Sequence, residues 1–357
     1  MRILINTPLI TIPAGVSNHY LGLKPYFSTN VIYNQYLTNN YIKLKFPRIY
    51  KPLRILTFIY DILKFIFLLI LNGFPLVLLN PSFGYRALHR DEIFLKIAKF
   101  FGCKVVVFIH GWDKHYLEDV ILNPRKFRSA WKNANAFFVL AKEFKEYLEQ
   151  FGIKVPVYLT STKVNDKLLT GVPEVKEFCK ISNLLFLARI EKAKGIFTAI
   201  DTFALLREKF PDLKLRVVGS GVMLEAAKKY ANENEIDNIT FTGPLSGDEL
   251  KREYINADIY ILPSLSEGMP TTVLEAMAFG LPVITRPVGG LIDFFKNEKM
   301  GYMIESLEPD KYADKIEILI KNIKKTQEIS SYNKAYAMKH FMASNVAKQL
   351  EGILKLI

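Results

Sequence analysis

Cysteine is scarce in this chain of 357 residues. The two cysteines, Cys103 and Cys179, can support neither a disulfide framework nor a cysteine-based metal site, and a reducing cytosol fits them best. Low-complexity tracts are also absent, and 50% of the residues are hydrophobic, so the chain is not disordered and can form large cores. The length suggests two domains.

Long apolar runs that would direct secretion or span a bilayer are missing as well. Met1 leads directly into the short strand-like run RILIN, so no signal peptide is expected. The segment Leu53–Leu71 is very apolar, but Arg54, Asp61 and Lys64 interrupt it, and a membrane-spanning helix is therefore not expected.

The polar residues of this segment follow a helical spacing. Together with Thr57, the three charged residues form one stripe on a helix whose remaining surface is apolar. Such a helix either is wedged deep in a core or leaves one side for a bilayer interface. We favour the core interpretation, because helices of α/β domains are often this apolar.

The charge balance is strongly basic, with a formal net charge of +13 and a pI of about 9.4. A basic surface can contact nucleic acid, anionic lipid or a phosphorylated small molecule. The lysines are scattered along the chain, so a nucleic-acid-binding tail is not indicated. We expect a cytoplasmic protein without a nucleic-acid partner, for which the inner membrane face is a candidate anionic surface.

Strand-like and helix-like segments alternate along nearly the whole chain. The expected strands are short, rich in β-branched or aromatic residues, and bounded by turn residues; they cover 2–6, 30–34, 75–80, 103–110, 136–141, 155–160, 183–188, 213–219, 238–243, 258–264 and 281–286. Helical patterns lie between them at 91–102, 141–152, 195–211, 223–235 and 247–257. This alternation predicts an α/β fold with parallel sheets, and its repetition predicts two Rossmann-like domains.

The weak point between the two halves is Ser161–Ser182, which is polar, contains glycine and proline, and has no clear periodicity. We therefore expect one domain over 1–165 and a second domain over 166–335. A C-terminal segment, 336–357, is expected to pack back on the first domain. Ligands of open α/β sheets bind beyond the carboxyl ends of the strands, so two facing sheets would form a cleft.

The segment LPSLSEGMPTTVLEAMAFGLPVIT places two carboxylates, Glu267 and Glu275, where a strand ends and a helix begins. The helix is expected to start near Thr271 or Thr272 and to stop before Gly280. Two acids in this position can simply complement the helix dipole. They can also accept hydrogen bonds from hydroxyl groups at either end of a bound ligand.

The residues between the two glutamates favour the second interpretation. Gly268, Met269, Pro270 and Thr271 lead into a helix N-terminus, whose unpaired N–H groups form an anion site. A diphosphate could bind there, with hydroxyl groups of a sugar and of a ribose reaching the two carboxylates. This combination describes a nucleotide-sugar.

Other strand ends in the second half add groups of the same kind. Arg189 and Lys194 follow one strand, and two cations there can neutralise a diphosphate, although solvated surface charge is the usual interpretation of a lone Arg or Lys. The turn VVGSG, with Gly219, allows close approach of the backbone to a ligand. The loop FTGPLSGDEL, with Leu245, could pair with a base.

These motifs together resemble glycosyltransferase family 4 of the GT-B fold, and the resemblance covers roughly Leu184 to Met303. It implies that Arg189 and Lys194 hold the donor diphosphate, that Glu267 binds hydroxyls of the transferred sugar, and that Glu275 binds the ribose. It further implies that the backbone from Gly268 to Thr271 touches the sugar and phosphates and that Leu245 lines the base. Asp293 stands where the family often has glutamate.

The resemblance is weaker in the first half. The loop Ala14–Ser17 looks like a shortened form of the family's glycine loop, which implies that Gly15 approaches the donor phosphates. His110 ends a strand, and the resemblance places it beside the reacting sugar, although a structural histidine is the more usual interpretation of a lone histidine. Asp113 and His115 are near it without a clear metal-binding spacing, so we expect no metal. With Trp112 they are candidates to shape an acceptor site.

The resemblance thus implies a retaining glycosyltransferase with an N-terminal acceptor-binding domain and a second, nucleotide-sugar-binding domain. We expect it to use an NDP-sugar as donor substrate, to need no cofactor, and to act on a saccharide or a lipid-linked saccharide in cell-surface glycan synthesis such as capsule or lipopolysaccharide. An NDP-sugar hydrolase or epimerase of the same fold is the nearest alternative. A Rossmann oxidoreductase would need the full G-x-G-x-x-G fingerprint, which is absent. A nucleic-acid binder would explain the charge but not the paired motifs.

Overall fold

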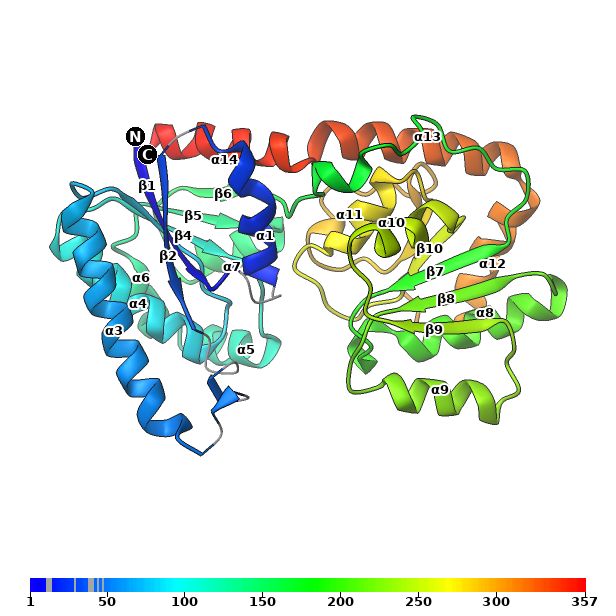
Figure 1. The fold of residues 1–357 in the computed structure, drawn as a ribbon, viewed down its shortest axis with the longest axis horizontal. Coiled ribbons are helices and arrows are strands. Elements are labelled where there is room, and N and C mark those ends of the chain that lie inside the picture. Colours follow the sequence, from blue (N-terminus) through cyan, green and yellow to red (C-terminus); the bar gives the residue numbers. More distant parts are fainter. Residues whose placement is uncertain (11–14, 29, 38–41, 44, 47) are drawn as a thin grey trace. The chain divides into compact units, whose positions relative to one another are not determined.

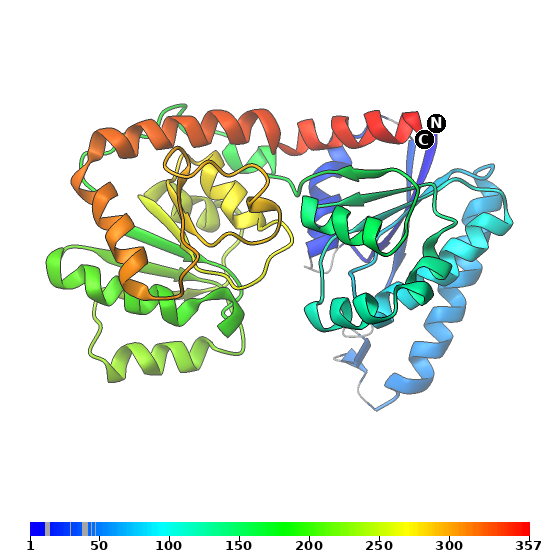
Figure 2. The same ribbon diagram turned by 180° about the vertical axis from the view of Figure 1, so that it is seen from behind.

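The structure is a computed structural model that describes residues 1–10, 15–28, 30–37, 42–43, 45–46 and 48–357. The chain divides into two compact units (Figures 1 and 2). Unit 1 comprises Met1–Ser161 with Val346–Ile357, and unit 2 comprises Thr162–Asn345. The first unit therefore ends at Ser161, slightly before the boundary expected at 165. The chain returns to unit 1 at Val346, later than the start expected at 336.

Unit 1 is built on a parallel sheet with the strand order β2-β1-β3-β4-β5-β6. The strands are β1 (Arg2–Pro8), β2 (Asn30–Tyr36), β3 (Leu76–Leu79), β4 (Val105–Ile109), β5 (Ala136–Val139) and β6 (Val157–Leu159). The helices, which lie on both faces of the sheet (Figures 1 and 2), are α1 (Gly15–Leu23), η1 (Lys24–Tyr26), α3 (Tyr50–Leu71), α4 (Tyr85–Phe100), α5 (Lys114–Leu122), α6 (Pro124–Trp131), α7 (Lys142–Gln150) and the greater part of α14 (Ala343–Leu356).

Unit 2 holds the second parallel sheet, ordered β12-β11-β10-β7-β8-β9. Its strands are β7 (Asn183–Leu187), β8 (Lys214–Val218), β9 (Ile239–Gly243), β10 (Ile259–Leu262), β11 (Val283–Thr285) and β12 (Gly301–Met303). Its helices are η2 (Asp166–Leu169), η3 (Lys192–Lys194), α8 (Ile196–Lys209), α9 (Leu224–Glu233), α10 (Gly247–Asn256), α11 (Thr271–Ala278), η4 (Gly289–Leu291), α12 (Pro309–Lys321) and α13 (Ile323–His340).

The sequence patterns explain these elements. The inner strands β3, β4 and β5 are buried along their whole length, because helices cover both faces of a parallel sheet. Gly102 and Gly152 follow α4 and α7 in the left-handed conformation, as expected for helix C-caps. All eleven strands expected from the sequence are present, and β12 is an additional strand that the three-residue pattern GYM did not reveal.

The end of the chain packs on unit 1. The Oγ of Ser28 donates a hydrogen bond of 2.6 Å to Oε2 of Glu351 on α14. The ammonium of Lys104, just before β4, donates to the carbonyl oxygen of Ile357 at 2.5 Å. Val346, Ala347, Leu350 and Leu354 are fully buried, so apolar packing adds to these polar contacts.

Helix α3 differs from the interpretation favoured above. Phe65 and Leu69 are its buried residues, and Phe58 and Ile62 pack partly against the core of unit 1. The deep-core interpretation is therefore wrong for most of this helix. Two residues of its polar stripe turn inward: the Lys64 ammonium donates to the carbonyl of Gln35 at 3.1 Å, and Asp61 is half-buried.

Asp61 faces a buried ionic cluster. The Arg90 guanidinium forms an ion pair with the fully buried Asp91 and stacks over the Tyr36 ring, with its central carbon 4.0 Å from the ring centroid. Asn6 donates a hydrogen bond of 3.3 Å to Oδ1 of Asp91. Burial raises the pKa of Asp61 to about 6, against the opposing effect of Lys64 and Arg90.

This pKa predicts how Asp61→Asn changes the pH dependence of stability. Because the carboxyl binds a proton more tightly in the folded state, its contribution to the free energy of unfolding falls as the pH rises from about 4 through about 6. Unfolding by urea, measured for both proteins at about pH 5 and about pH 7.5, should therefore show Asp61→Asn gaining relative to the unsubstituted protein at the higher pH. An identical difference at both pH values would contradict the assignment.

Candidate functional site

The predicted donor residues of unit 2 lie in loops that follow neighbouring strands. In the sheet, β8 and β9 follow β7 on one side. The next strand along the chain, β10, lies on the other side of β7. The boundary between β7 and β10 is thus a topological switch point, where ligands of open α/β sheets bind beyond the carboxyl ends of the strands. Lys194 follows β7 and Glu267 follows β10, so the structure places both at this point.

Lys194 and Glu267 form an ion pair, with 2.7 Å between Nζ and Oε1. Their side chains are only 13% and 12% exposed. Backbone and hydroxyl contacts hold the two loops together: the N–H of Leu265 donates to the carbonyl of Ala193 at 2.8 Å, and Oγ of Ser264 donates to the same oxygen at 3.2 Å. The residues assigned to the diphosphate and to the sugar are therefore direct neighbours.

Gly195 permits this approach. It has a φ of 76°, and a Cβ on it would stand 2.2 Å from the carbonyl oxygen of Pro263. The backbone of η3 therefore packs directly on the end of β10, which only glycine allows.

Arg189 is placed differently from Lys194. Its side chain is 71% exposed, and Nη1 contacts Oε1 of Glu191 at 2.7 Å. Arg189 also follows β7, so it lies at the same edge of the sheet as Lys194. A side chain this exposed can change rotamer, because surface ion pairs contribute little free energy.

The glycine turns of unit 2 have a packing role that the sequence did not reveal. A Cβ on Gly219 would lie 2.0 Å from the carbonyl oxygen of Ala188, and one on Gly221 would lie 2.3 Å from that of Ile190. A Cβ on Gly289 would likewise lie 2.2 Å from the carbonyl oxygen of Glu267. These glycines let the loops contact each other. This packing role is additional to the close approach to a ligand that we expected.

The predicted helix after Glu267 is confirmed as α11. Pro270 is its N-cap residue, and Gly280, with a φ of 77°, follows its end. Gly268 accepts a backbone hydrogen bond of 2.7 Å from Gly290, and the carbonyl of Met269 accepts one of 3.3 Å from Oγ1 of Thr162. The N–H groups of the first turn, from Thr271, have no carbonyl one turn earlier within the helix, as at every helix start.

Glu275 lies one turn into α11 and is half-buried. The hydroxyl of Tyr254 donates a hydrogen bond of 2.8 Å to its Oε2. Burial raises the pKa of Glu275, while the hydrogen bond from Tyr254 and the charge of the buried Lys163 oppose this shift. Leu245, in the loop between β9 and α10, is half-exposed.

His110 of unit 1 belongs to a polar cluster. Its Nε2 lies 3.1 Å from Oδ1 of Asn80, which also accepts a 2.6 Å hydrogen bond from the hydroxyl of Tyr20. Since Nδ2 of Asn80 donates to the carbonyl of Asn6 at 3.0 Å, Oδ1 is the acceptor and Nε2 of His110 carries the proton. Burial lowers the pKa of His110 to about 3, so the imidazole is neutral at pH 7.

The other first-half candidates have structural roles or high exposure. Asp113 is the N-cap of α5 and accepts hydrogen bonds from the N–H groups of His115 and Tyr116. The ring of Trp112 stacks between Phe83 and Phe144 and is half-buried against the core of unit 1. Gly15 begins α1 and is exposed, whereas Ala14 lies outside the described residues. The described part of the chain contains no group of three or more potential metal ligands.

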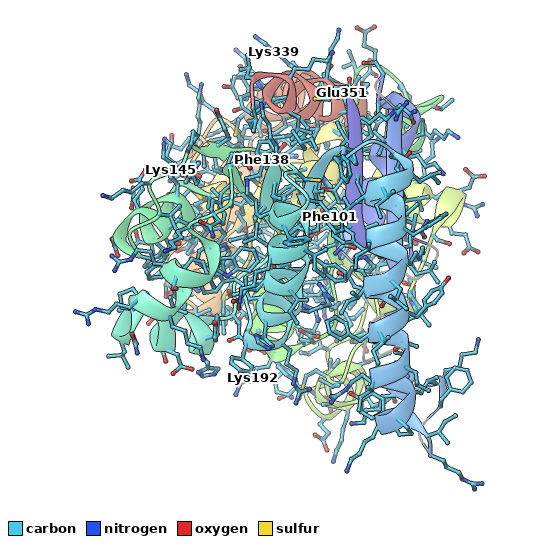
Figure 3. All side chains as sticks on the ribbon, turned by 90° about the vertical axis from the view of Figure 1, so that its left-hand side faces the viewer. Phe101, Phe138, Lys145, Lys192, Lys339 and Glu351 are labelled. Atoms are coloured by element: carbon cyan, nitrogen blue, oxygen red, sulfur yellow. The ribbon has the colours of Figure 1, made fainter. Side chains whose placement is uncertain are left out.

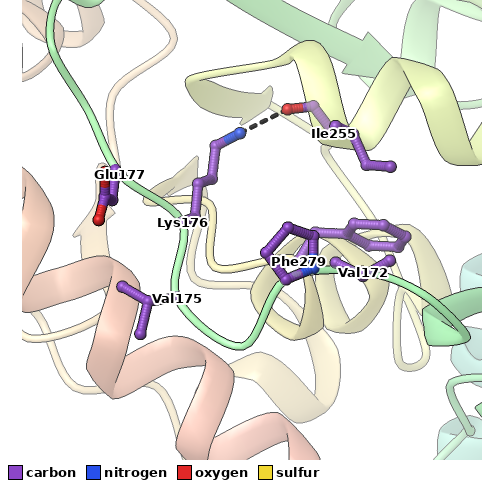
Figure 4. Close-up of a pocket in the computed structure, with 7 residues that line it drawn as sticks. Val172, Val175, Lys176, Glu177, Ile255 and Phe279 are labelled. Carbon is purple, nitrogen blue, oxygen red and sulfur yellow. Dashed lines mark hydrogen bonds between the residues drawn. The ribbon is translucent and has the colours of Figure 1, made fainter.

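A pocket of about 410 Å³ lies elsewhere in unit 2 (Figure 4). It is formed by the segment 172–177, by Ile255 of α10 and by Phe279 at the end of α11. Lys176 points to the carbonyl of Ile255 and donates to it at 2.5 Å. Phe279 also stacks on Tyr254, with 4.9 Å between the ring centroids, and the hydroxyl of Tyr254 donates to Glu275.

Comparison with known proteins shows that unit 2 is similar in sequence to glycosyltransferases. Residues 180–336 match the sequence model of the glycosyl transferases group 1 family. The chain is 28% identical over 195 residues to an uncharacterized glycosyltransferase of Methanocaldococcus jannaschii, a match covering 54% of this chain and 48% of the relative. It is 30% identical over 174 residues to a D-inositol 3-phosphate glycosyltransferase of an Arthrobacter species, covering 47% and 40%. The chain thus matches about half or less of these relatives' length.

The solved structures agree with the predicted fold. Anabaena HepE in complex with UDP superposes with a TM-score of 0.74 over 100% of both chains, at 16% identity. Two Rossmann-like units, each with a six-stranded parallel sheet, together with this similarity confirm the predicted α/β fold class.

Several polar groups near the predicted site were not found from the sequence. Tyr254 and Lys163 flank Glu275, and the hydroxyl of Tyr260 donates to the carbonyl of Leu187 at 2.8 Å and contacts Oγ1 of Thr272 at 2.7 Å. In unit 1, Asn80 holds both His110 and Tyr20. Asn80 directly follows a strand, which is the signal that could have identified it.

Gly195→Ala tests the packing of the two loops. Any L-residue in the left-handed region loses about 1–2 kcal/mol, and Ala at 195 would also clash with Pro263. Gly171→Ala is the matched control, because Gly171 has a similar φ of 74° and nothing within 4 Å of its virtual Cβ. Thermal unfolding should show a clearly larger loss for Gly195→Ala. Equal losses would mean that the loops can separate without consequence.

The His110 pKa can be measured directly. Because burial disfavours the imidazolium, the ring signals of His110 in NMR spectra should show no titration between about pH 8 and about pH 5. Protonation is expected only near pH 3, the range of its lowered pKa. A titration midpoint above about pH 6 would show that the ring is not buried as described.

Proposed function

We propose that this protein is a retaining glycosyltransferase that moves a sugar from an NDP-sugar to a hydroxyl acceptor. The observation that carries the proposal is the Lys194–Glu267 pair at the switch point, beside the start of α11. A cation next to a helix N-terminus suits a diphosphate, and a carboxylate beside it suits the sugar hydroxyls. The family match over 180–336 and the transferases similar to this chain support the same activity.

The ion pair does not prevent Lys194 from binding phosphate. An ammonium group has three protons, so Nζ can keep its contact with Glu267 and donate to a phosphate oxygen at the same time. Glu267 can then accept hydroxyl protons of the sugar through its remaining lone pairs. Arg189 would leave Glu191 and form a bidentate contact with the diphosphate, for which its exposed side chain has the freedom.

The other donor contacts follow from their positions. Oε2 of Glu275 accepts from Tyr254, which leaves Oε1 for the ribose hydroxyls. The backbone of Gly268, Met269, Pro270 and Thr271 would contact the sugar and phosphates, with Gly219 and Leu245 nearer the nucleoside. In unit 1, the roles of His110 beside the reacting sugar and of Gly15 near the phosphates rest on the family resemblance.

The reaction needs no protein nucleophile. The bond between the anomeric carbon and the phosphate oxygen breaks, and the acceptor oxygen bonds to the same face of that carbon. The acceptor proton passes to an oxygen of the leaving diphosphate. Lys194, Arg189 and the N-terminus of α11 stabilise the negative charge that develops there, so electrostatic stabilisation supplies the main catalytic effect. We expect the reaction to proceed without a metal ion.

The donor nucleotide is proposed to be uridine or guanosine diphosphate. UDP is bound in the structure of Anabaena HepE, which has the same fold. The acceptor is proposed to be a saccharide or a lipid-linked saccharide in capsule, lipopolysaccharide or other cell-surface glycan synthesis. We place the protein in the cytoplasm, with a peripheral position on the inner membrane face. Hydrolysis or epimerisation of the NDP-sugar is the alternative, and product analysis with a radiolabelled sugar separates the three reactions.

Substitution of the central pair tests the proposal. Lys194→Ala and Glu267→Ala should each abolish sugar transfer, measured as nucleoside diphosphate release and labelled product. Both should retain the far-UV circular dichroism of the unsubstituted protein, with lower thermal midpoints because each leaves a largely buried charge without its partner. Near-normal turnover in both variants would refute the roles.

Lys192→Ala provides the matched control, because Lys192 is an exposed lysine in the same turn, η3. It should transfer sugar at the normal rate. A thermal-shift screen with UDP-, GDP- and ADP-sugars should identify a donor that raises the midpoint of the unsubstituted protein and of Lys192→Ala. The same donor should have little effect on Lys194→Ala.

A further inference from the structure

Helix α3 exposes its apolar side. Its exposed large apolar residues are each between 49% and 64% exposed. They are Ile55, Leu56, Ile59, Tyr60, Leu63, Phe67, Ile70 and Leu71. They recur at spacings of three and four, so they form one continuous stripe along a helix of 22 residues, about 33 Å long. Figure 3 views unit 1 from the side on which α3 lies.

The helix cannot turn this stripe inward. Phe65 and Leu69 are buried in the core of unit 1, and Phe65 packs edge-on against Phe94 with 4.9 Å between the ring centroids. Lys64 is hydrogen-bonded to Gln35, and Asp61 faces the Arg90 cluster. The polar stripe therefore points partly toward the domain while the apolar stripe faces outward, which reverses the usual arrangement of a surface helix.

The apolar surface continues past the end of the helix. Phe74 is 49% exposed and stacks on Phe101, with 5.9 Å between the ring centroids. Phe101 in turn packs edge-on against Phe100. Exposed apolar surfaces larger than a few hundred Å² are rare on monomeric soluble proteins and mark interaction sites.

Basic residues gather at the other end. Lys43, Lys45, Arg48, Lys51 and Arg54 are all exposed there. The only carboxylate between residues 42 and 74 is Asp61, which faces the domain. The surface formed by the apolar stripe and these five cations, the α3 surface, is thus apolar along its length and cationic at one end.

An apolar stripe with basic residues at one end favours an anionic bilayer surface over a second copy of the chain as the partner. Among the described residues no helix is long and apolar enough to cross a membrane, so α3 does not span one. A second copy of the chain would bring no carboxylate from its own α3 surface to pair with the five cations. A helix with an apolar face and basic residues binds in the interface plane of a membrane that contains anionic lipids.

We propose that the α3 surface docks the protein on an anionic membrane, with α3 lying in the headgroup region and its apolar stripe facing the acyl chains. The inference deepens the peripheral location proposed above by naming the surface that binds. It does not require sugar transfer, so its failure and the failure of the transferase proposal can be distinguished.

Vesicle co-sedimentation tests the α3 surface. The full chain should bind vesicles containing phosphatidylglycerol, bind vesicles of phosphatidylcholine alone more weakly, and lose part of its binding in high salt. Leu63→Gln with Phe67→Gln should reduce binding by about tenfold or more, because two large apolar contacts are removed. Lys51→Glu with Arg54→Glu should remove the preference for anionic lipid.

The controls use residues outside the α3 surface. Leu122 and Leu356 of unit 1 are 84% and 80% exposed, and Leu122→Gln with Leu356→Gln should leave binding unchanged. Lys194→Ala should also bind vesicles normally. The proposal is overturned if the unsubstituted protein does not bind anionic vesicles, or if the Leu63/Phe67 variant binds equally well. It is also overturned if the chain is a dimer in solution that only this variant converts to a monomer.

Discussion

Close contact between backbones, possible only at glycine, organises the candidate site. Gly195 packs on Pro263, Gly219 on Ala188, and Gly289 on Glu267, each where a Cβ would lie within 2.2 Å of a carbonyl oxygen. These contacts draw together the loops after β7, β8, β10 and β11, although their residues are far apart in the sequence. The placement of Lys194 against Glu267 depends on this packing, because the two side chains extend from loops that the glycines bring into contact.

The parallel sheets were predictable because their signals are local. Buried strands such as Val105–Ile109 are continuous apolar runs, and glycines such as Gly152 mark helix ends. The start of α11 was predictable for the same reason, since Pro270 and Gly280 bound it. The loops after successive parallel strands must meet at one edge, so the chain order alone placed Arg189, Gly219, Leu245 and Glu267 at the same edge of one sheet.

What the sequence could not show is which groups contact each other. The hydrogen bond from Tyr254 to Glu275 joins two helices, and the Asn80 contacts of His110 and Tyr20 join three separated segments. The periodicity of hydrophobic residues in the sequence does not reveal such pairs. The orientation of α3 was misjudged because composition alone cannot decide which side of an apolar helix faces the core; the contacts of Phe65 and Lys64 decide it.

The pairing of Lys194 with Glu267 has a consequence for ligand discrimination. An inorganic anion can accept one proton of the ammonium while the Lys194–Glu267 contact persists, but it brings no hydrogen-bond donor to the carboxylate, which is only 12% exposed. A molecule that brings negative oxygens and hydroxyl groups together satisfies both side chains at once. The pair therefore favours ligands of dual character over simple salts.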